Sequence, residues 1–332
     1  MSKFEKWDEN CSLESLQNIA DACVHCGKCR ENCAFLDKYE MDLGDVTRLQ
    51  EHVYGCFLCG NCDRVCPAGI SGRQLFQNLR RMQVRDGKLE EKPYSFVLKE
   101  KKDYKFRNYR NATAGRVLFP GCNFPSMFPK TNRKIADLCK AKGIGTVYDC
   151  CGKPIAELGL YRDEERIVNR ISRELESRGI GEVITTCPNC YYFLKERIPQ
   201  RVRSIYEVLP ELVPEISVPK DIEIQIPCPD RTDREWYNGI CKLLGYEPFV
   251  TSAEQCCGLG GMASAEEPEL AKKFGKGLTS SGLRNTTFCA SCAGQYARNG
   301  KEIRHVLSLL LGMDEAPATK TSYLNRVKTK YK

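Results

Sequence analysis

The sequence CVHCGKCRENC (Cys23–Cys33) contains four cysteines with the spacing C-x2-C-x2-C-x3-C. The same spacing recurs in CFLCGNCDRVC (Cys56–Cys66). A structural zinc site uses two short cysteine pairs separated by a longer loop, and this makes zinc the weaker alternative. Three cysteines at three-residue steps instead suit three irons of one cluster, so we expect two [4Fe–4S] clusters near the N-terminus.

The fourth cysteine of each run is expected to serve the neighbouring cluster, as it does in two-cluster ferredoxins. By that rule one cubane cluster is held by Cys23, Cys26, Cys29 and Cys66. The other cubane is held by Cys33, Cys56, Cys59 and Cys62. Cys66 is followed by Pro67, as in bacterial ferredoxins, whereas Cys33 is followed by Ala34.

The segment between the two runs, residues 34–55, is too long for a small ferredoxin and is predicted to be helical. Its apolar residues recur at three- and four-residue steps: Leu43, Val46, Leu49 and Val53. Ser71 is a predicted N-cap of a further helix that ends near Arg85. This region resembles the helical two-cluster ferredoxin domain of succinate dehydrogenase-like and heterodisulfide reductase-like proteins.

Ten of the remaining cysteines form two ordered sets. The first set is Cys122, Cys150, Cys151, Cys187 and Cys190. The second set is Cys228, Cys256, Cys257, Cys289 and Cys292. In each set, 27 residues separate the first cysteine from a Cys-Cys-Gly triplet, and a C-x2-C pair follows later. The flanks also match, since LCKAKG (138–143) corresponds to ICKLLG (240–245), and this indicates an internal duplication.

Each copy is predicted to have an α/β fold. VLFPGC (117–122), GEVITTC (181–187) and IEIQIPC (222–228) are expected strands that each lead into a cysteine. Helices are expected at residues 135–142 and 236–244. Open α/β sheets bind ligands at the carboxyl ends of their strands, which is where these thiols fall. Gly152 and Gly258 are predicted to let the backbone approach a bulky cofactor without a Cβ clash.

The repeated pattern C-x27-CCG…CxxC resembles the cysteine-rich CCG domain of heterodisulfide reductases. The same domain occurs in iron–sulfur subunits of glycolate, lactate and glycerol-3-phosphate dehydrogenases. Together with the N-terminal runs, the resemblance extends over about residues 20–312. The chain looks like a fused form of two reductase subunits. It implies that each complete five-cysteine set binds a noncubane [4Fe–4S] cluster, with zinc in one set as the alternative. The second copy departs from it, since IPCPD (226–230) stands where many relatives have an aromatic-His-Asp-Pro-Cys sequence.

The predicted fold class is α plus α/β, with a helical two-cluster domain followed by two α/β repeats. The expected boundaries are 1–110 for the helical domain, 111–220 and 221–315 for the two CCG repeats, and 316–332 for a basic tail. Cys139 and Cys241 occupy matching positions on apolar helix faces and are expected in the core, while Cys11 has no assigned role. The three histidines are expected to be surface or packing residues.

The resemblance implies an oxidoreductase subunit acting on a sulfur group, which passes electrons through two cubane clusters to the CCG sites. Disulfide cleavage needs two electrons, and two neighbouring sites would each hold one half of the substrate. Expected partners are a flavoprotein, ferredoxin or hydrogenase-type donor and a small thiol disulfide. The alternative function is an electron-relay subunit of a flavin-dependent 2-hydroxy-acid or glycerol-3-phosphate dehydrogenase. A zinc-bound scaffold is a third, non-redox alternative.

Composition and charge narrow these expectations. The N-terminal residues lack the apolar stretch of a signal peptide, so 21 cysteines indicate metal or redox chemistry in the reducing cytoplasm. No transmembrane helix is expected, so coupling to quinone would need a membrane partner subunit. Residues 80–116 carry twelve Lys/Arg against five acids, and residues 316–332 carry five basic residues and no acid. These segments are either a solvated linker and a frayed terminus or a docking surface for an acidic redox partner. No nucleic-acid motif accompanies the charge.

Overall fold

The computed structural model describes residues 7–251 and 255–331 and divides the chain into two compact units. The first unit contains Met1–Lys102, Pro154–Glu164 and Glu254–Gly277. The second unit contains Asp103–Lys153, Glu165–Ala253 and Leu278–Lys332. Both units therefore combine residues from more than one of the predicted sequence modules, whose boundaries remain a prediction.

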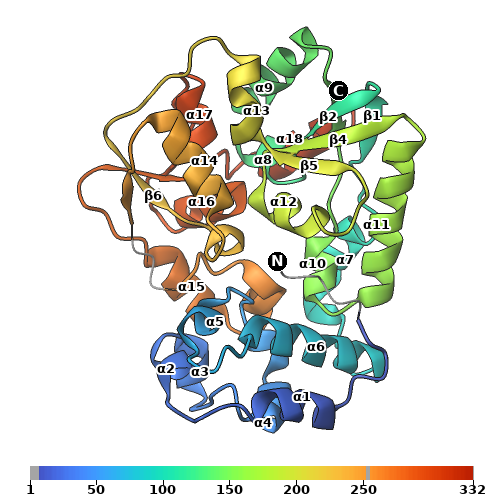
Figure 1. Cartoon of the computed structure of the whole chain (residues 1–332), viewed down its shortest axis with the longest axis vertical. Coiled ribbons are helices and arrows are strands. Elements are labelled where there is room, and N and C mark those ends of the chain that lie inside the picture. The colour runs from blue at the N-terminus through green and yellow to red at the C-terminus, as the bar shows by residue number, and fades with distance from the viewer. Residues whose placement is uncertain (1–6, 252–254, 332) are drawn as a thin grey trace. The chain divides into compact units, whose positions relative to one another are not determined.

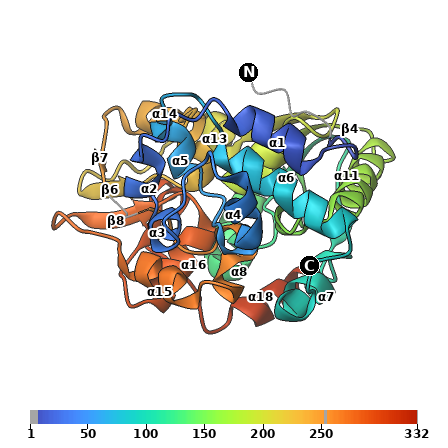
Figure 2. The same ribbon diagram turned by 90° about the horizontal axis from the view of Figure 1, so that it is seen from below.

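Short helices form the first unit (Figure 1, blue to cyan). They are α1 (Leu13–Ala20), α2 (Lys28–Glu31), α3 (Ala34–Lys38), α4 (Val46–Glu51), η1 (Val53–Gly55), α5 (Asn61–Val65), α6 (Gly72–Arg85), η2 (Lys92–Tyr94) and α7 (Ser95–Lys101). Figure 2 shows α2, α3 and α5 side by side, and they are in contact. Ser71 caps α6 by accepting a hydrogen bond from the backbone N–H of Gln74, so the predicted N-cap is confirmed.

The segment between the cysteine runs is helical but is not one helix. Its predicted apolar residues are all buried. Glu40 has a positive φ of 51° after α3, a conformation that a helix cannot continue. The side chain of Asp45 then accepts a hydrogen bond from the backbone N–H of Arg48 and starts α4. The positive φ of Glu40 and the N-cap at Asp45 therefore interrupt a segment that the apolar spacing alone predicts to be helical.

Two segments from later in the chain complete the first unit. One contains most of α10 (Lys153–Glu157) and the start of α11 (Tyr161–Glu176), and the other contains η4 (Gly260–Ala265) and α15 (Pro268–Lys276). Figure 1 shows α15, in orange, beside the blue helices. Phe57 and Phe274 meet edge to face with ring centroids 5.0 Å apart. Glu267 accepts hydrogen bonds from Lys38 Nζ at 2.7 Å and Tyr39 Oη at 2.5 Å.

A sheet in the order β1-β3-β2-β4-β5 forms the core of the first repeat in the second unit (Figure 1). The strands are β1 (Asn108–Asn111), β2 (Gly115–Phe119), β3 (Gly145–Tyr148), β4 (Ile180–Thr185) and β5 (Arg201–Ser204). β1 is antiparallel to β3, and the other neighbouring pairs are parallel. The helices of this repeat, besides α11, are α8 (Phe124–Met127), α9 (Pro129–Ala141), α12 (Pro188–Leu194) and α13 (Ile205–Leu212).

The second repeat has a sheet in the order β7-β6-β8-β9, and all of its pairs are parallel. The strands are β6 (Ile222–Gln225), β7 (Phe249–Val250), β8 (Arg284–Thr287) and β9 (Arg304–His305). The helices are η3 (Cys228–Asp230), α14 (Glu235–Leu244), α16 (Ala290–Arg298) and α17 (Val306–Leu310). The order β3-β2-β4-β5 of the first sheet and β7-β6-β8-β9 of the second is the same connection pattern. The predicted fold class, a helical domain with two α/β repeats, is confirmed.

The C-terminal segment folds onto the second unit, so the expectation of a frayed terminus is wrong for its described residues. It forms α18 (Ser322–Thr329), which packs against α8. Asn325 Nδ2 donates a hydrogen bond to the carbonyl oxygen of Ser126 at 3.0 Å. Asn108 Nδ2 donates to the carbonyl oxygen of Thr329 at 3.0 Å.

The basic stretch 80–116 is not a solvated linker. Arg80 is fully buried, and Arg81 is buried in an ion pair with Glu164 at 3.1 Å. Arg116 pairs with Glu182. The lysines of the stretch that remain exposed are Lys88, Lys92, Lys99 and Lys105. Part of the positive charge in this stretch therefore acts inside the fold, while the exposed lysines and arginines keep the rest at the surface.

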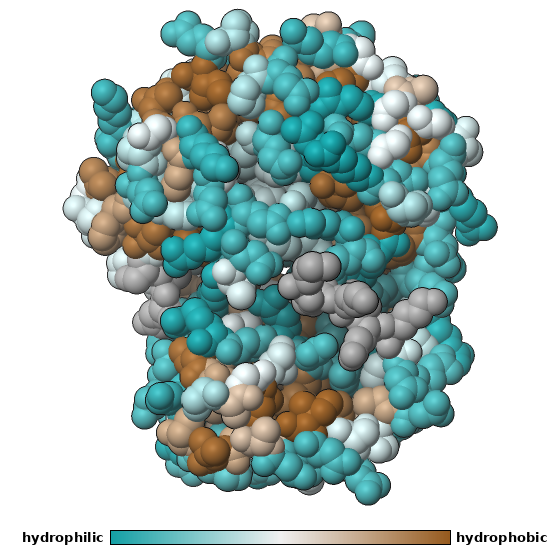
Figure 3. All heavy atoms as spheres, in the orientation of Figure 1, coloured by the Kyte–Doolittle hydropathy of each residue, from teal (hydrophilic) through white to brown (hydrophobic). Residues whose placement is uncertain are grey.

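Hydrophilic residues dominate the face shown in Figure 3, and hydrophobic residues appear on it in separate groups. Among the described residues, no helix is long and apolar enough to cross a membrane.

Candidate metal centres

The two N-terminal cysteine runs adopt the same backbone conformation. The residues two and four positions after the first cysteine have positive φ in both runs: His25 at 51°, Gly27 at 74°, Leu58 at 48° and Gly60 at 67°. The backbone N–H of His25 donates to Cys23 Sγ at 3.4 Å. The backbone N–H of Leu58 donates to Cys56 Sγ at the same distance. Positive φ at a non-glycine residue is uncommon, so its recurrence at one position indicates a shared ligand loop.

One small cavity, of about 10 Å³, lies at the first run. The cysteines that line it are Cys23, Cys26, Cys29 and Cys66. The other lining residues, among them Asp42 and Leu43, also lie between positions 23 and 68. Cys26 is exposed, so this site reaches the protein surface.

A second small cavity, also of about 10 Å³, lies at the second run. Its cysteines are Cys33, Cys56, Cys59 and Cys62, and all four are buried. Phe35, Phe57, Phe76 and Gln255 also line it. The two groupings are those that the crossed assignment expects, and cluster ligation by them remains a prediction.

The chemistry of the second cavity fits an iron–sulfur cluster. Burial and the neighbouring Cys59 raise the pKa of the Cys33 thiol to about 11. Burial also raises the pKa of the Cys56 and Cys62 thiols. Four buried thiolates are unfavourable without a cationic centre, and bound iron supplies one. The four sulfurs around this cavity are therefore a suitable donor set for a cubane cluster.

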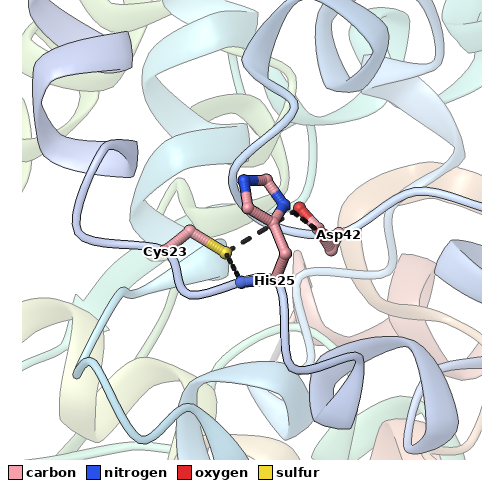
Figure 4. Close-up of side chains that lie close together, drawn as sticks. All are labelled: Cys23, His25 and Asp42. Carbon is pink, nitrogen blue, oxygen red and sulfur yellow. Dashed lines mark hydrogen bonds and ion pairs between the residues drawn. The ribbon is translucent and has the colours of Figure 1, made fainter.

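Three side chains with potential metal-ligand atoms also lie beside the first cavity, but one of them, Cys23, already belongs to the four cysteines that line this cavity. Cys23, His25 and Asp42 offer ligand atoms within 4.8 Å of one another (Figure 4). His25 Nδ1 lies 2.8 Å from Asp42 Oδ2, and Cys23 Sγ lies 3.8 Å from Asp42 Oδ1. Cys23 also lines the cavity shared by four cysteines. We therefore interpret the exposed His25–Asp42 pair as a surface interaction next to the ligand loop, as the surface assignment of His25 expects.

The first five-cysteine set lies at the carboxyl ends of three adjacent parallel strands. Cys122 follows β2, Cys150 and Cys151 follow β3, and Cys187 and Cys190 follow β4. Gly121 has a φ of 72°, and a Cβ there would lie only 2.9 Å from Cys190 Sγ. Position 121 therefore requires glycine, because a side chain there would collide with the Cys190 thiol.

The thiols of the first set interact with one another. The Cys150 and Cys190 thiols form hydrogen bonds with Cys151, and this lowers the pKa of Cys151 to about 5. The same interaction with Cys151 raises the pKa of Cys190. One sulfur in the group is therefore stabilised as a thiolate, the form that binds metal.

The structure describes the second five-cysteine set in two parts. Cys228, Cys289 and Cys292 lie in the second unit, where they follow the parallel neighbours β6 and β8. A hydrogen bond from Cys292 lowers the pKa of Cys289 to about 7. Cys256 and Cys257 lie in the first unit, and Cys256 Sγ accepts a hydrogen bond from the backbone N–H of Gly258 at 3.3 Å.

The C-x2-C loops of the two repeats meet within the second unit. Asn189, between Cys187 and Cys190, has its Nδ2 atom 3.5 Å from Cys289 Sγ. Asn123 Nδ2 donates to Ser291 Oγ, between Cys289 and Cys292, at 2.7 Å. The first C-x2-C loop thus reaches one thiol of the second set through an asparagine side chain. Sequence reasoning missed both asparagines, because no local pattern relates residues a hundred positions apart.

The glycines of the Cys-Cys-Gly triplets have positive φ, 95° at Gly152 and 83° at Gly258. A Cβ at Gly152 would lie 3.0 Å from Ile167 on α11. A Cβ at Gly258 would lie 2.5 Å from the carbonyl oxygen of Ala271 on α15. Close packing of a helix therefore requires both glycines, and their contact with a cofactor remains a prediction.

Cys139 and Cys241, which were both expected in the core, differ in their burial. Cys139 is fully buried, and burial raises the pKa of its thiol to about 12. Cys241 is half-buried on α14. His305 is buried, and its Nδ1 atom accepts the backbone N–H of Leu307 at the start of α17. Burial lowers the pKa of His305 to about 3, so it is a neutral packing residue.

Arg80 is a buried cation in the stretch that was expected to be either a solvated linker or a docking surface. Its guanidinium donates to the carbonyl oxygens of four residues at 2.6–3.1 Å: Val53, Cys56, Glu157 and Gly261. It thus joins a cluster-ligand loop to both segments that complete the first unit. The arginine could not be recognised from sequence, because its acceptors are backbone atoms far along the chain.

Two family models match the chain. The 4Fe-4S dicluster domain matches residues 19–70. The cysteine-rich domain called CCG matches residues 117–195 and 232–297.

Curated relatives match over most of the chain. A subunit of the fumarate reductase (CoM/CoB) of Methanothermobacter marburgensis is 25% identical, over 76% of this chain and 62% of that protein. A subunit of the dihydromethanophenazine:CoB–CoM heterodisulfide reductase of Methanosarcina barkeri is 22% identical, over 84% of this chain and 87% of that protein. The glycolate oxidase iron–sulfur subunit of Escherichia coli is 21% identical, over 81% of this chain and 86% of that protein. The chain spans only 55–62% of the length of several of its relatives.

Proposed function

Because the chain combines a 4Fe-4S dicluster domain with two cysteine-rich CCG domains and is related to a heterodisulfide reductase subunit, we propose that it is an oxidoreductase subunit that reduces a disulfide. In this proposal the two N-terminal quartets hold cubane clusters, and each five-cysteine set holds one noncubane [4Fe–4S] cluster. A flavoprotein, ferredoxin or hydrogenase-type subunit donates the electrons, and a separate membrane subunit would be needed for coupling to quinone.

The observation that carries the proposal is the meeting of the two C-x2-C loops. Asn189 of the first loop contacts Cys289 of the second, so the C-x2-C loops of the two sets adjoin in one compact unit. Reduction of R–S–S–R′ to RSH and R′SH consumes two electrons and two protons. Clusters bound at the two sites would supply one electron each. Adjoining sites allow the two halves of one small disulfide to be held at the same time.

The state of the thiols supports a reducing cellular setting, and we propose the cytoplasm. None of the cysteines, all of which lie among the described residues, forms a disulfide. Thiols of both sets already interact in pairs, Cys151 with Cys190 and Cys289 with Cys292. Metal ligation requires reduced cysteines, and a reducing compartment maintains them.

The similarity to the glycolate oxidase iron–sulfur subunit favours one alternative function. In that alternative the CCG sites only relay electrons from a flavin-dependent dehydrogenase to an acceptor. The two functions differ in whether both sites are needed at once. A relay retains some activity through one surviving site, whereas disulfide cleavage requires both.

We would test this with Cys151→Ala and Cys257→Ala, prepared anaerobically. Each variant should lose turnover with a panel of small thiol disulfides, while dithionite still reduces its N-terminal clusters. Cys241→Ala is the matched control, because Cys241 belongs to the second repeat but to neither set. Wild-type protein that reduces a dye but no disulfide, even with its physiological donor, would favour the relay function.

A further inference from the structure

Gln255 contacts two of the sulfurs in the second N-terminal cavity. Its side chain is 5% exposed. The Nε2 atom lies 3.3 Å from Cys33 Sγ and 3.5 Å from Cys59 Sγ. Both distances are within the range of N–H···S hydrogen bonds. Gln255, the second cavity and both cysteines belong to the first compact unit.

The orientation of the Gln255 amide is set by a third contact. The backbone N–H of Ala34 donates to Gln255 Oε1 at 2.9 Å. A backbone N–H can only donate, so it must face the oxygen of the amide and not the NH₂ group. The NH₂ group is therefore the end that faces the two sulfurs, where each of its two hydrogens has an acceptor.

The first cavity has a different environment. A carboxylate oxygen of Asp42 lies 3.8 Å from Cys23 Sγ, and Cys26 is exposed to solvent. The second cavity has buried thiols, an amide donor and the guanidinium of Arg80, which donates to the carbonyl oxygen of the ligand residue Cys56 at 2.7 Å. Cys62 Sγ of the second quartet also lies 3.4 Å from a carboxylate oxygen, that of Asp63. The two quartets therefore differ in burial and in the amide and guanidinium groups at the second one, and not in the presence of a carboxylate.

We propose that Gln255 raises the reduction potential of the second cubane and makes it the acceptor for an electron from the first. Reduction adds negative charge to a cluster and its sulfurs, and donated N–H bonds stabilise that charge. One electron leaves the exposed first cubane and enters the buried second one. Gln255 is covalently followed by Cys256 and Cys257, so the same residue joins the second cubane to the second CCG set.

This inference rests on the proposal that Cys33, Cys56, Cys59 and Cys62 hold a cubane. It goes further by giving the direction of electron flow, which ligand spacing leaves open. In this inference Gln255 is not itself a metal ligand. Its side chain acts through the sulfurs of Cys33 and Cys59, to which it donates hydrogen bonds.

The test is an anaerobic redox titration monitored by EPR, with iron counted for each sample. Gln255→Met has a similar length and cannot donate a hydrogen bond. In this variant the second cubane should titrate at a lower potential while the first is unchanged. At a solution potential equal to the wild-type midpoint, less than half of the second cubane should be reduced.

Gln255→Glu is the second variant, because its carboxylate can still accept from Ala34 but cannot donate to sulfur. It should lower the potential of the second cubane further than Gln255→Met. Gln77→Met is the matched control, since Gln77 donates to the carbonyl oxygen of Ala156 at 2.6 Å in the same unit. The control should leave both potentials unchanged.

The outcomes separate the two proposals. Wild-type protein without two cubane signals would overturn the ligand assignment and this inference together. Two cubanes with unchanged potentials in both Gln255 variants would overturn only the inference. A first cubane with the higher potential in the wild type would also overturn it, since electrons would then not pass to the second.

Discussion

The fourth cysteine of each run lies with the first three cysteines of the other run, and this crossing is a property of single residues. Cys33 lines the cavity of Cys56, Cys59 and Cys62. Cys66 lines the cavity of the first run. The third cysteine of each run, Cys29 or Cys62, lies within a short helix, α2 or α5, and the fourth cysteine follows the end of that helix. The spacing of three residues between the third and fourth cysteines therefore directs the fourth sulfur to the neighbouring site.

This crossing makes a testable prediction. Cys33→Ser should damage the second cubane, so its EPR spectrum should match that of Cys59→Ser and differ from that of Cys26→Ser. Cys66→Ser provides the reciprocal control and should match Cys26→Ser. If Cys33→Ser instead resembles Cys26→Ser, each run ligates its own cluster and the crossed assignment is wrong.

Residues that depend on distant partners were not predictable. The ligand loops could be recognised because three-residue spacing is local, and Ser71 could be recognised because an N-cap acts on the next turn. Gln255 lies 222 residues from Cys33, and Arg80 lies 181 residues from Gly261. A single sequence carries no signal for such contacts. A charged residue in a basic stretch is also expected at the surface. The burial of Arg80 could not be predicted, because its guanidinium is bound by carbonyl groups from three separate chain segments.

At the scale of elements, strand ends were predictable and helix divisions were not. Hydrophobic strands that lead into cysteines became β2, β4 and β6, and each ends two or three residues before the thiol. The helix expected between the runs is divided by Glu40 and Asp45, whose effect is conformational and not hydrophobic. The C-terminal α18 was missed because polar residues, including Asn325, form its contacts with α8.

The segment 88–101, which contains η2 and α7, retains exposed positive charge. Lys88, Lys92 and Lys99 are exposed, and Phe96 is 67% exposed on the same segment. Reversing these three lysines to glutamate should slow electron delivery from an acidic donor at low salt, because opposite charges speed encounter. The effect should fade as added salt shortens the screening length to about 8 Å at 0.15 M.

Stopped-flow reduction by the physiological donor would measure this rate. Reversal of Lys140, Lys142 and Lys220 is the matched control, since these exposed lysines of the second unit give the same change of net charge. A rate that is equal in both triple variants and independent of salt would show that the segment 88–101 has no role in docking.

At the scale of the whole molecule, the four sites predict the metal content. Anaerobically prepared protein should hold about sixteen irons per chain, from four clusters of four irons each. The measurement is iron, zinc and acid-labile sulfide per chain. About eight irons with one or two zincs would leave clusters only at the N-terminal runs and contradict iron–sulfur chemistry at the CCG sites.

The two segments that complete the first unit have a consequence for biosynthesis. Among the described residues, those that line the first cavity lie within positions 23–68, so they leave the ribosome well before residue 255. Gln255 also lines the second cavity. Arg80, which is hydrogen-bonded to the carbonyl oxygen of Cys56 in that cavity, also donates to the carbonyl oxygen of Gly261. The second site therefore lacks part of its lining on the nascent chain until residues 255–261 have been synthesised. Iron–sulfur assembly factors can reach its buried thiols during that interval, before the arrival of residues 255–277 closes the site.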